Sequence, residues 1–278
     1  MMTSSRTLRL AMIAAAVTAT MAACDRGDRA PKTDKAPAEA LAEGPLKYES
    51  ITPYAKVSLS LPETIRSFPD LYNDLYQTEV GALKDYVEGA QSDRSEFGSA
   101  DLPPYEKNIS FAVPVETDRL FSMIRTDFDY SGGAHPNTVA TGILWDKSLN
   151  KRITAEDLIA KDANRAALAR TLCQAIDTAK KGRPGSVPLS TGGTWTCPDL
   201  KDLSIVLAKG DTAKKASGIT FLLDAYEVGP YVEGAYYITL PFEALRQSIN
   251  PAYAAEFGGT GKTGDVTQVL FEDEKAAN

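Results

Sequence analysis

The sequence predicts an α+β protein of two small lobes, with antiparallel sheets and two long helices. Residues 108–115, 120–130 and 138–145 alternate between polar and apolar side chains, which is the period of a half-buried strand. Residues 70–89 and 164–180 instead place apolar side chains three or four positions apart, as in an amphipathic helix. Strands and helices do not alternate regularly as in βαβ proteins, which favours α+β over α/β.

The elements of the first half follow from local signals. Residues 56–61 alternate and stop at Pro62, as expected for a strand. The helix over 70–89 follows Pro69, a residue favoured in the first helical turn, and residues 93–104 have the composition of a loop. The apolar positions of this helix are Tyr72, Leu75, Tyr76, Val80, Leu83 and Val87.

The strands of residues 108–145 include an acidic face and a glycine-rich turn. Asp127 and Asp129 lie two positions apart and therefore share one face of their strand. We interpret them as part of a solvated sheet face, with carboxylate chemistry as the alternative. Residues 131–137 form the turn between the second and third of these strands.

The second half has weaker strand signals. Residues 154–157 resemble a capping box, and the helix over 164–180 has Leu168, Leu172 and Ile176 four positions apart. Residues 182–198 have the composition of a long loop. Strands are expected at 203–207, 219–225 and 235–240, a short helix at 241–249 and a frayed tail at 259–278.

Composition excludes several classes of function. The 278 residues include 30 basic and 37 acidic side chains, a net charge of −7, whereas nucleic-acid binding needs a basic surface. One histidine and three cysteines cannot assemble the common zinc sites from a single copy. We therefore expect no nucleic-acid partner, no metal and no other cofactor.

The N-terminus has the features of a secretion signal. Two arginines precede an apolar run over residues 10–21, which is too short to cross a bilayer as a helix. The run ends in Met-Ala-Ala-Cys24, which resembles the signal of bacterial lipoproteins, where a lipid is joined to the cysteine thiol. On this resemblance residues 1–23 are a signal peptide and Cys24 is lipidated; an ordinary cleavable signal with a chance cysteine is the alternative.

Residues 24–45 predict a flexible tether, because they are rich in Ala, Lys, Asp and Pro and contain no aromatic side chain. Cleavage before Cys24 leaves 28 basic and 37 acidic residues, a net charge of −9. We expect a protein of the cell envelope, held on a membrane by its N-terminal lipid, with the domain facing the periplasm or the exterior. The choice between inner and outer membrane stays open.

Two motifs occur in the folded part. The first is Tyr130-Ser-Gly132-Gly133-Ala-His135-Pro-Asn137, and the second is Tyr226-Glu-Val-Gly-Pro230-Tyr231-Val-Glu-Gly234, followed by Ile-Thr-Leu-Pro-Phe-Glu-Ala-Leu at 238–245. In order and separation they resemble a bacterial domain of unknown function. That domain occurs in the extracytoplasmic part of the anti-sigma factor RsiV and beside the catalytic domain of the deacetylase PdaC.

The resemblance covers about residues 48–249 and implies an N-terminal lobe at 46–150 and a C-terminal, RsiV-like lobe at 151–258. It implies no single activity. In RsiV the domain binds lysozyme, whereas in PdaC the chemistry belongs to a separate domain that has no equivalent here. The resemblance therefore implies a recognition domain that faces the envelope.

His135 is the only histidine and so the first candidate for catalysis. Acid–base catalysis needs an orienting partner and a reacting group, and no Gly-x-Ser-x-Gly elbow supplies a serine. We interpret Gly132 and Gly133 as residues that permit an unusual turn, with His135 closing it. Contact with a ligand or partner is the second interpretation and catalysis the third.

The remaining candidates are aromatic residues and cysteines. Tyrosines around two glycines suit a sugar or protein surface, although alternate tyrosines also simply pack a strand. Cys173 and Cys197 predict a disulfide in an oxidising compartment, with a redox or metal pair as the weaker alternative. The aromatic set is Tyr226, Pro230, Tyr231, Tyr236 and Tyr237.

We therefore expect a membrane-tethered lipoprotein with a non-catalytic recognition domain. Its expected partner is a lysozyme-like basic protein or a peptidoglycan fragment, and the negative charge would steer a cationic protein towards it. The alternative is an enzyme or accessory subunit that acts on cell-wall glycans through His135. A structural envelope protein without a soluble ligand is the third possibility.

Overall fold

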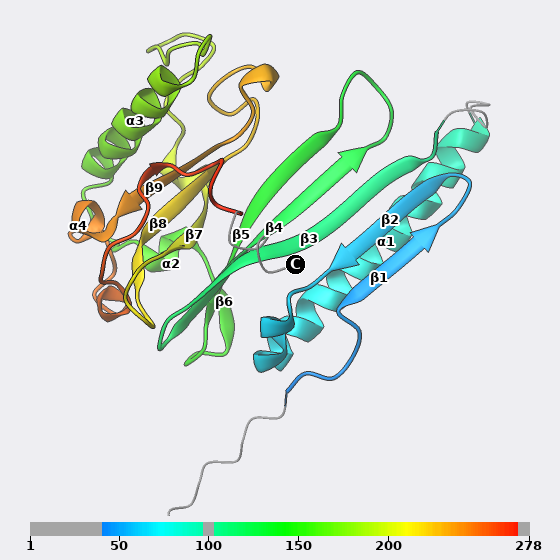
Figure 1. The fold of residues 1–278 in the computed structure, drawn as a ribbon, viewed down its shortest axis with the longest axis horizontal. Helices are drawn as coiled ribbons and strands as arrows, with labels where there is room; N and C mark the ends of the chain where they lie inside the picture. The colour runs from blue at the N-terminus through cyan, green and yellow to red at the C-terminus, as the bar shows by residue number, and fades with distance from the viewer. Residues whose placement is uncertain (1–40, 97–102, 272–278) are drawn as a thin grey trace, which may run out of the picture. The chain divides into compact units, whose positions relative to one another are not determined.

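The computed structural model describes residues 41–96 and 103–271. Outside these ranges lie the expected signal peptide, the expected lipidation site Cys24, the expected tether up to residue 40, and residues 272–278. The described chain forms two sheets and two long helices, which confirms the predicted α+β class (Figure 1). Among the helices of these ranges, none combines the length and the hydropathy that a bilayer crossing requires.

The first sheet has six strands that follow chain order. Neighbouring strands are antiparallel except β2 and β3, which run parallel. The sequence signals predicted the middle strands but not the short strands β1 and β6. The strands are β1 (Lys47–Ile51), β2 (Ala55–Ser60), β3 (Tyr105–Glu116), β4 (Leu120–Tyr130), β5 (Asn137–Asp146) and β6 (Lys151–Ile153).

Helix α1 (Pro69–Glu96) packs on one face of the first sheet and is the crossover that the parallel pair β2–β3 requires. Leu75 and Leu83 are buried against the strands, as their spacing predicts, and Leu71, which the predicted stripe did not include, is buried beside them. The helix runs beyond the predicted end at residue 89 because Gly89 weakens a helix without stopping it. The turn η1 (Glu63–Ser67) precedes α1.

The acidic face of β4 is paired with basic side chains and only partly exposed, which differs from the solvated face that we expected. Arg125 donates to both carboxylate oxygens of Glu79 on α1, at 2.6 and 2.9 Å, and to Asp127 at 3.0 Å. Lys107 on β3 lies 2.6 Å from Asp127 and 3.4 Å from Asp129. The aspartates therefore balance two cations that the helix partly covers.

The second sheet has the strand order β10-β9-β8-β7 and is antiparallel throughout. Helix α3 (Arg165–Gly182) packs on one face of it through the predicted stripe of Leu168, Leu172 and Ile176. The strands are β7 (Ser204–Lys209), β8 (Ala216–Leu223), β9 (Tyr236–Pro241) and β10 (Gly264–Asp265).

Short elements complete the second sheet's core. In the predicted capping box, the backbone N–H of Thr154 donates to the Asp157 carboxylate at 2.8 Å and helix α2 (Ala155–Leu158) follows. The predicted helix at 241–249 is shorter, α4 (Phe242–Leu245). The remaining turns are η2 (Leu200–Asp202), η3 (Tyr231–Glu233) and η4 (Ala254–Glu256).

The two sheets meet where β4 and β5 approach β7. At Gly142 a Cβ atom would lie 1.9 Å from the carbonyl oxygen of Ile205, so only glycine allows this approach. Two serines bridge the junction: the Gly142 N–H donates to Ser204 Oγ at 2.7 Å, and the Leu207 N–H donates to Ser122 Oγ at 3.1 Å.

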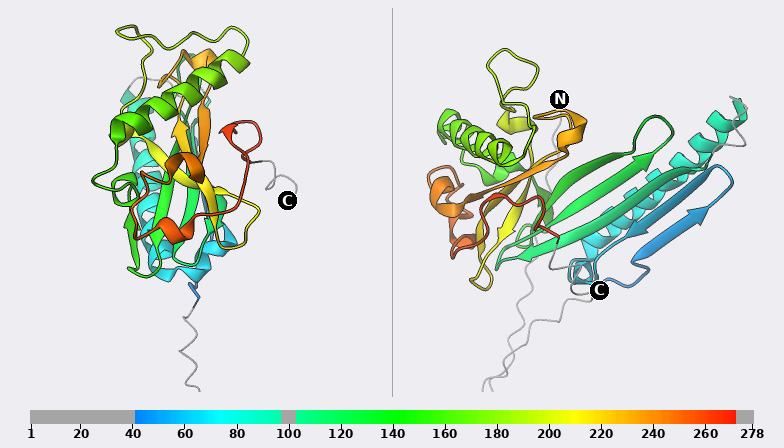
Figure 2. Two further views of the ribbon diagram at one scale, coloured as in Figure 1. Left: turned by 90° about the vertical axis from the view of Figure 1, so that its left-hand side faces the viewer. Right: turned by 45° about the horizontal axis from the view of Figure 1, so that its top comes forward.

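Two expectations about the ends of the folded part are wrong. Residues 42–45 were expected in the tether, but Ala42 is buried and donates its N–H to the Arg66 carbonyl at 2.8 Å. The tail was expected to fray, but residues 259–271 cover the face of the second sheet opposite α3 (Figure 2). There β10 pairs with β9, and Val266 is only 4 % exposed because it packs among apolar side chains.

Candidate functional site

The first motif forms the turn between β4 and β5. Gly132 and Gly133 have φ angles of 94° and 98°, a region that side chains disfavour, so the turn needs glycine at both positions. Tyr130 closes it by donating from its hydroxyl to the Gly133 carbonyl at 3.3 Å, and Asn137 begins β5. The turn holds His135 at the surface, with its side chain exposed.

The second motif forms the connection between β8 and β9. Tyr226 has a φ angle of 74°, which is uncommon for an aromatic residue and marks a strained backbone. Pro230 precedes the turn η3, and Gly234 ends it with a φ angle of 70°. Gly229 is required for a different reason: a Cβ there would lie 2.6 Å from a carboxylate oxygen of a buried ion pair.

The two motifs meet at His135, which contacts Tyr226 of the second motif, 91 positions further along the chain. The imidazole stacks on the ring of Tyr231, with centroids 3.7 Å apart and planes inclined by 17°. Its Nε2 lies 3.2 Å from the hydroxyl of Tyr226. The Tyr231 hydroxyl in turn donates to the carbonyl of Pro136 at 2.8 Å. We call His135, Tyr226 and Tyr231 the aromatic site.

The hydrogen bonds at His135 fix the position of its proton. Nδ1 lies 2.9 Å from the Pro136 carbonyl oxygen, which only accepts, so Nδ1 donates. In the neutral imidazole Nε2 is therefore the acceptor and receives the Tyr226 hydroxyl hydrogen. Both ring nitrogens are engaged by groups of the site itself, which leaves no free base for a substrate in this arrangement.

The tyrosines of the second motif divide between the core and the surface. Tyr236 and Tyr237 are 0 % and 7 % exposed and pack the second sheet. Tyr226 is 52 % exposed, and the neighbouring Val232 is 89 % exposed. The packing interpretation is therefore right for two of them, whereas the surface interpretation fits Tyr226 and Tyr231.

Two carboxylates accompany the aromatic site. Asp224, directly after β8, accepts the N–H of Ala140 with both of its oxygens at 3.0 Å. Burial raises the pKa of Asp224 to about 6, and the Ala140 hydrogen bond only partly offsets this. Burial and the neighbouring Asp224 also raise the pKa of Glu227, although its backbone hydrogen bond acts in the opposite direction. These carboxyl groups, two residues before and one residue after Tyr226 in the chain, therefore keep their protons to a higher pH than usual.

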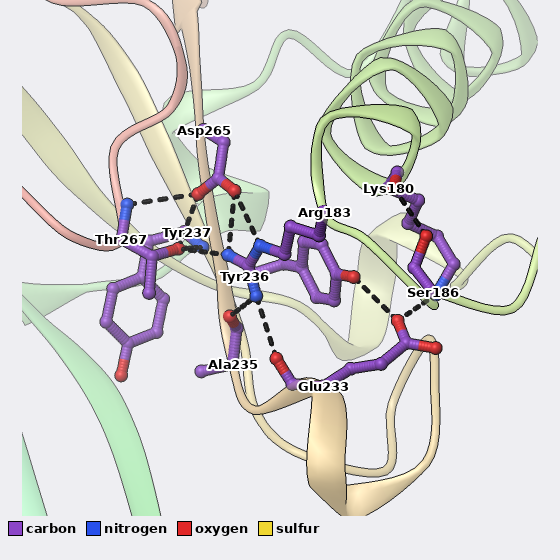
Figure 3. A network of polar contacts seen from close by, with 9 residues as sticks. All are labelled: Lys180, Arg183, Ser186, Glu233, Ala235, Tyr236, Tyr237, Asp265 and Thr267. Carbon is purple, nitrogen blue, oxygen red and sulfur yellow. Dashed lines mark hydrogen bonds and ion pairs between the residues drawn. The ribbon is translucent and has the colours of Figure 1, made fainter.

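A buried ion pair holds the second motif against α3 (Figure 3). Lys180 is only 2 % exposed and donates from Nζ to the Val228 carbonyl at 2.7 Å and to Glu233 at 2.6 Å. Glu233 also accepts the Tyr236 hydroxyl at 2.6 Å and the Val187 N–H at 2.7 Å. Burial alone would raise the pKa of Glu233, but these hydrogen bonds together hold it below its ordinary value.

Arg183 links the same loop to the C-terminal segment (Figure 3). Its guanidinium donates to the carbonyls of Glu233 and Ala235 at 2.9 and 2.7 Å and to Asp265 at 2.9 and 2.7 Å. It also lies over the ring of Tyr236, 3.6 Å from the centroid. One side chain at the end of α3 thus positions the ends of two loops.

A disulfide joins Cys173 on α3 to Cys197 in the loop that follows, with Cα atoms 5.8 Å apart. It anchors the loop whose earlier part supplies the Val187 N–H to Glu233. Within the described ranges, no group of three or more His, Cys, Asp or Glu residues has the arrangement of a metal site.

Comparison with known proteins identifies the fold. No family model and no curated protein matches the sequence. Among solved structures, a member of the DUF3298 family from Bacteroides fragilis aligns with a TM-score of 0.51 and 18 % identity, over 73 % of this chain and 86 % of that one. A DUF3298 family protein from Pseudomonas aeruginosa PAO1 aligns with a TM-score of 0.44 and 16 % identity, over 82 % of this chain and 99 % of that one. The first similarity shows a shared fold.

The structure thus brings together residues from both predicted motifs and adds several that sequence reasoning missed. The missed residues lie behind the loop, where they position it: Lys180, Arg183 and Asp265. A signal existed for Lys180, because it extends the i+4 series of Leu168, Leu172 and Ile176 into the buried face of α3. No local signal pairs Arg183 with Asp265, since 82 positions separate them.

Proposed function

We propose that this chain is a membrane-tethered lipoprotein of the bacterial envelope whose domain recognises a cationic, lysozyme-like protein through the aromatic site. The observation behind the proposal is the contact between the two motifs at His135, which presents Tyr226 and Val232 outward. Exposed aromatic residues on a held backbone are typical anchors of protein interfaces. The lipid anchor rests on the sequence around Cys24.

Three further features favour recognition over glycan chemistry. Both nitrogens of His135 are already hydrogen-bonded within the site, Nδ1 to the Pro136 carbonyl and Nε2 to the Tyr226 hydroxyl. The chain carries 37 acidic against 30 basic side chains, and this negative net charge suits a cationic partner. The structural neighbours are DUF3298 proteins, a group related to the RsiV/PdaC-type domain.

The test is a calorimetric titration of the purified domain with lysozyme at physiological salt. We expect binding that weakens as salt rises, because opposite charges face each other. Tyr226→Ala should reduce the affinity about 30-fold or more if Tyr226 is an interface anchor. Absence of binding to lysozyme would contradict the proposed partner, and binding of peptidoglycan fragments instead would identify the other expected ligand.

A matched pair of variants separates loss of contact from loss of fold. Val232 and Ile51 are β-branched residues that are 89 % and 74 % exposed, the first beside the aromatic site and the second on β1 of the other sheet. Val232→Lys should weaken binding at least tenfold, because a cation there would repel a cationic partner, whereas Ile51→Lys should leave binding nearly unchanged. Equal effects of the two substitutions would contradict the location of the site.

A further inference from the structure

A cavity lies on the face of the second sheet opposite α3, and it shares no residue with the aromatic site. Its volume of about 630 Å³ is within the range of sites for small organic ligands. One wall is the C-terminal segment that was expected to fray, and the other is the bulge in β3. Its apolar lining residues include Val113, Pro114, Leu207, Val266, Val269 and Leu270.

The bulge places a strained residue at this cavity. Val113 has a φ angle of 55°, which is a true outlier for a β-branched side chain and marks a strained backbone. The register of β3 against β4 shifts between Ala112 and Val115, so Val113 and Pro114 leave the ladder and line the cavity. Bulges of this kind re-aim side chains next to binding sites.

The sheet contributes one pair of polar side chains to the lining. Thr220 on β8 and Thr239 on β9 are opposite each other in the register, 1 % and 2 % exposed, with hydroxyl oxygens 2.8 Å apart. One hydroxyl hydrogen makes this bond. The second has no acceptor among the described residues, so the cavity wall keeps a buried donor.

The apolar walls and the free hydroxyl hydrogen of the threonine pair together define the kind of ligand group that could accept this hydrogen bond. At the threonine pair a charged acceptor would lose its hydration, because Thr220 and Thr239 are buried, whereas the charged lining residues Lys209, Asp211 and Lys262 are exposed. A neutral carbonyl oxygen on an aliphatic body satisfies both the donor and the walls.

We propose that this cavity binds a neutral aliphatic ester or amide, such as an acyl chain ending in an ester, with its carbonyl oxygen accepting from the Thr220–Thr239 pair. The C-terminal segment forms one side of the site, since Val266 donates its N–H to Tyr237 at 2.9 Å and Val269 and Leu270 follow in the same turn. The site would be a second binding function, independent of the aromatic site.

The test is displacement of the fluorescent probe N-phenyl-naphthylamine from the purified protein by methyl octanoate, octane and octanoate. We expect the ester to displace the probe at lower concentration than the alkane or the charged acid. The double substitution Thr220→Val/Thr239→Val keeps the shape of the cavity and removes both hydroxyls. It should weaken ester binding about 3- to 10-fold, the usual share of one neutral hydrogen bond, and leave octane unchanged.

Two outcomes would overturn the inference. If the probe does not bind, or no competitor displaces it, the cavity is not a ligand site. If the ester and the alkane compete equally in both proteins, the threonine pair does not select the ligand. Ala208→Phe, which would fill the cavity from β7, should abolish probe binding, and the valine variants guard against the case in which this larger change unfolds the protein.

Discussion

The buried pair of Lys180 and Glu233 makes the sharpest prediction about stability. Their side chains are 2 % and 5 % exposed, so either charge alone would be buried without compensation. Lys180→Met removes the cation. The Glu233 carboxylate then keeps two hydrogen-bond donors, the Tyr236 hydroxyl and the Val187 N–H, and no opposite charge. Breaking a buried pair in this way costs about 3–5 kcal/mol of unfolding free energy.

A double-mutant cycle isolates the pair from the packing of the two side chains. Glu233→Gln keeps the shape and neutralises the anion, so Lys180→Met/Glu233→Gln removes both charges together. We expect the double variant to be less destabilised than the sum of the single variants by about 2–3 kcal/mol. Urea unfolding at neutral pH, followed by tryptophan fluorescence with an unchanged m-value, measures all four proteins.

The same pair has a pH signature. In the folded protein the pKa of Glu233 is below its ordinary value of 4.5, so its contribution is present above that pH and is lost as the pH falls through the folded value. The stability difference between wild type and Glu233→Gln should therefore shrink below about pH 4.5. Additive single effects, or a Lys180→Met cost below about 1 kcal/mol, would refute the reasoning.

Three further predictions concern other parts of the chain. Replacing both Cys173 and Cys197 by serine should lower the unfolding free energy by about 3 kcal/mol, because the disulfide closes a loop between residues that are 24 positions apart. Urea unfolding curves that coincide with those of the wild type would contradict this. Burial raises the pKa of Asp224 from 3.8 to about 6, so wild type should lose stability relative to Asp224→Asn as pH rises through this interval, and pH-independent differences in Tm would contradict it. Gly142→Ala should cost about 1–3 kcal/mol by overpacking against Ile205, with an undisturbed Tm as the contrary result.

The central strands and both long helices could be predicted because each keeps one periodicity for many residues. Alternation located β3, β4 and β5, and the i+4 series located α3. The packed tail escaped prediction because its strand has only two residues. A signal was nevertheless present, since Val266, Val269 and Leu270 lie three and four positions apart and enter the core of the second sheet.

The candidate site shows a different limit. Its glycines and His135 could be recognised from the sequence of the first motif alone. The sequence pattern, however, gives no reason for His135 to contact Tyr226 rather than solvent. That contact depends on the junction of the two sheets. There Gly142 lets β5 approach the backbone of Ile205 on β7, and the residues around Gly142 in the sequence give no sign of this approach. Asp127 shows the same limit: it belongs to an alternating pattern that indicates a solvated face, but it pairs with Lys107 and Arg125 and its side chain is only 17 % exposed.

The origin of the aromatic site in two sheets has a consequence for the binding that we propose. His135 belongs to the β4–β5 hairpin of the first sheet, and Tyr226 and Tyr231 belong to the β8–β9 loop of the second. A partner that contacts both loops binds only when the junction is formed, so binding stabilises the junction by mass action. The ion pair of Lys180 and Glu233 fixes one loop from behind, and the paired glycines shape the other. The affinity of the site is therefore expected to depend on residues that never contact the partner.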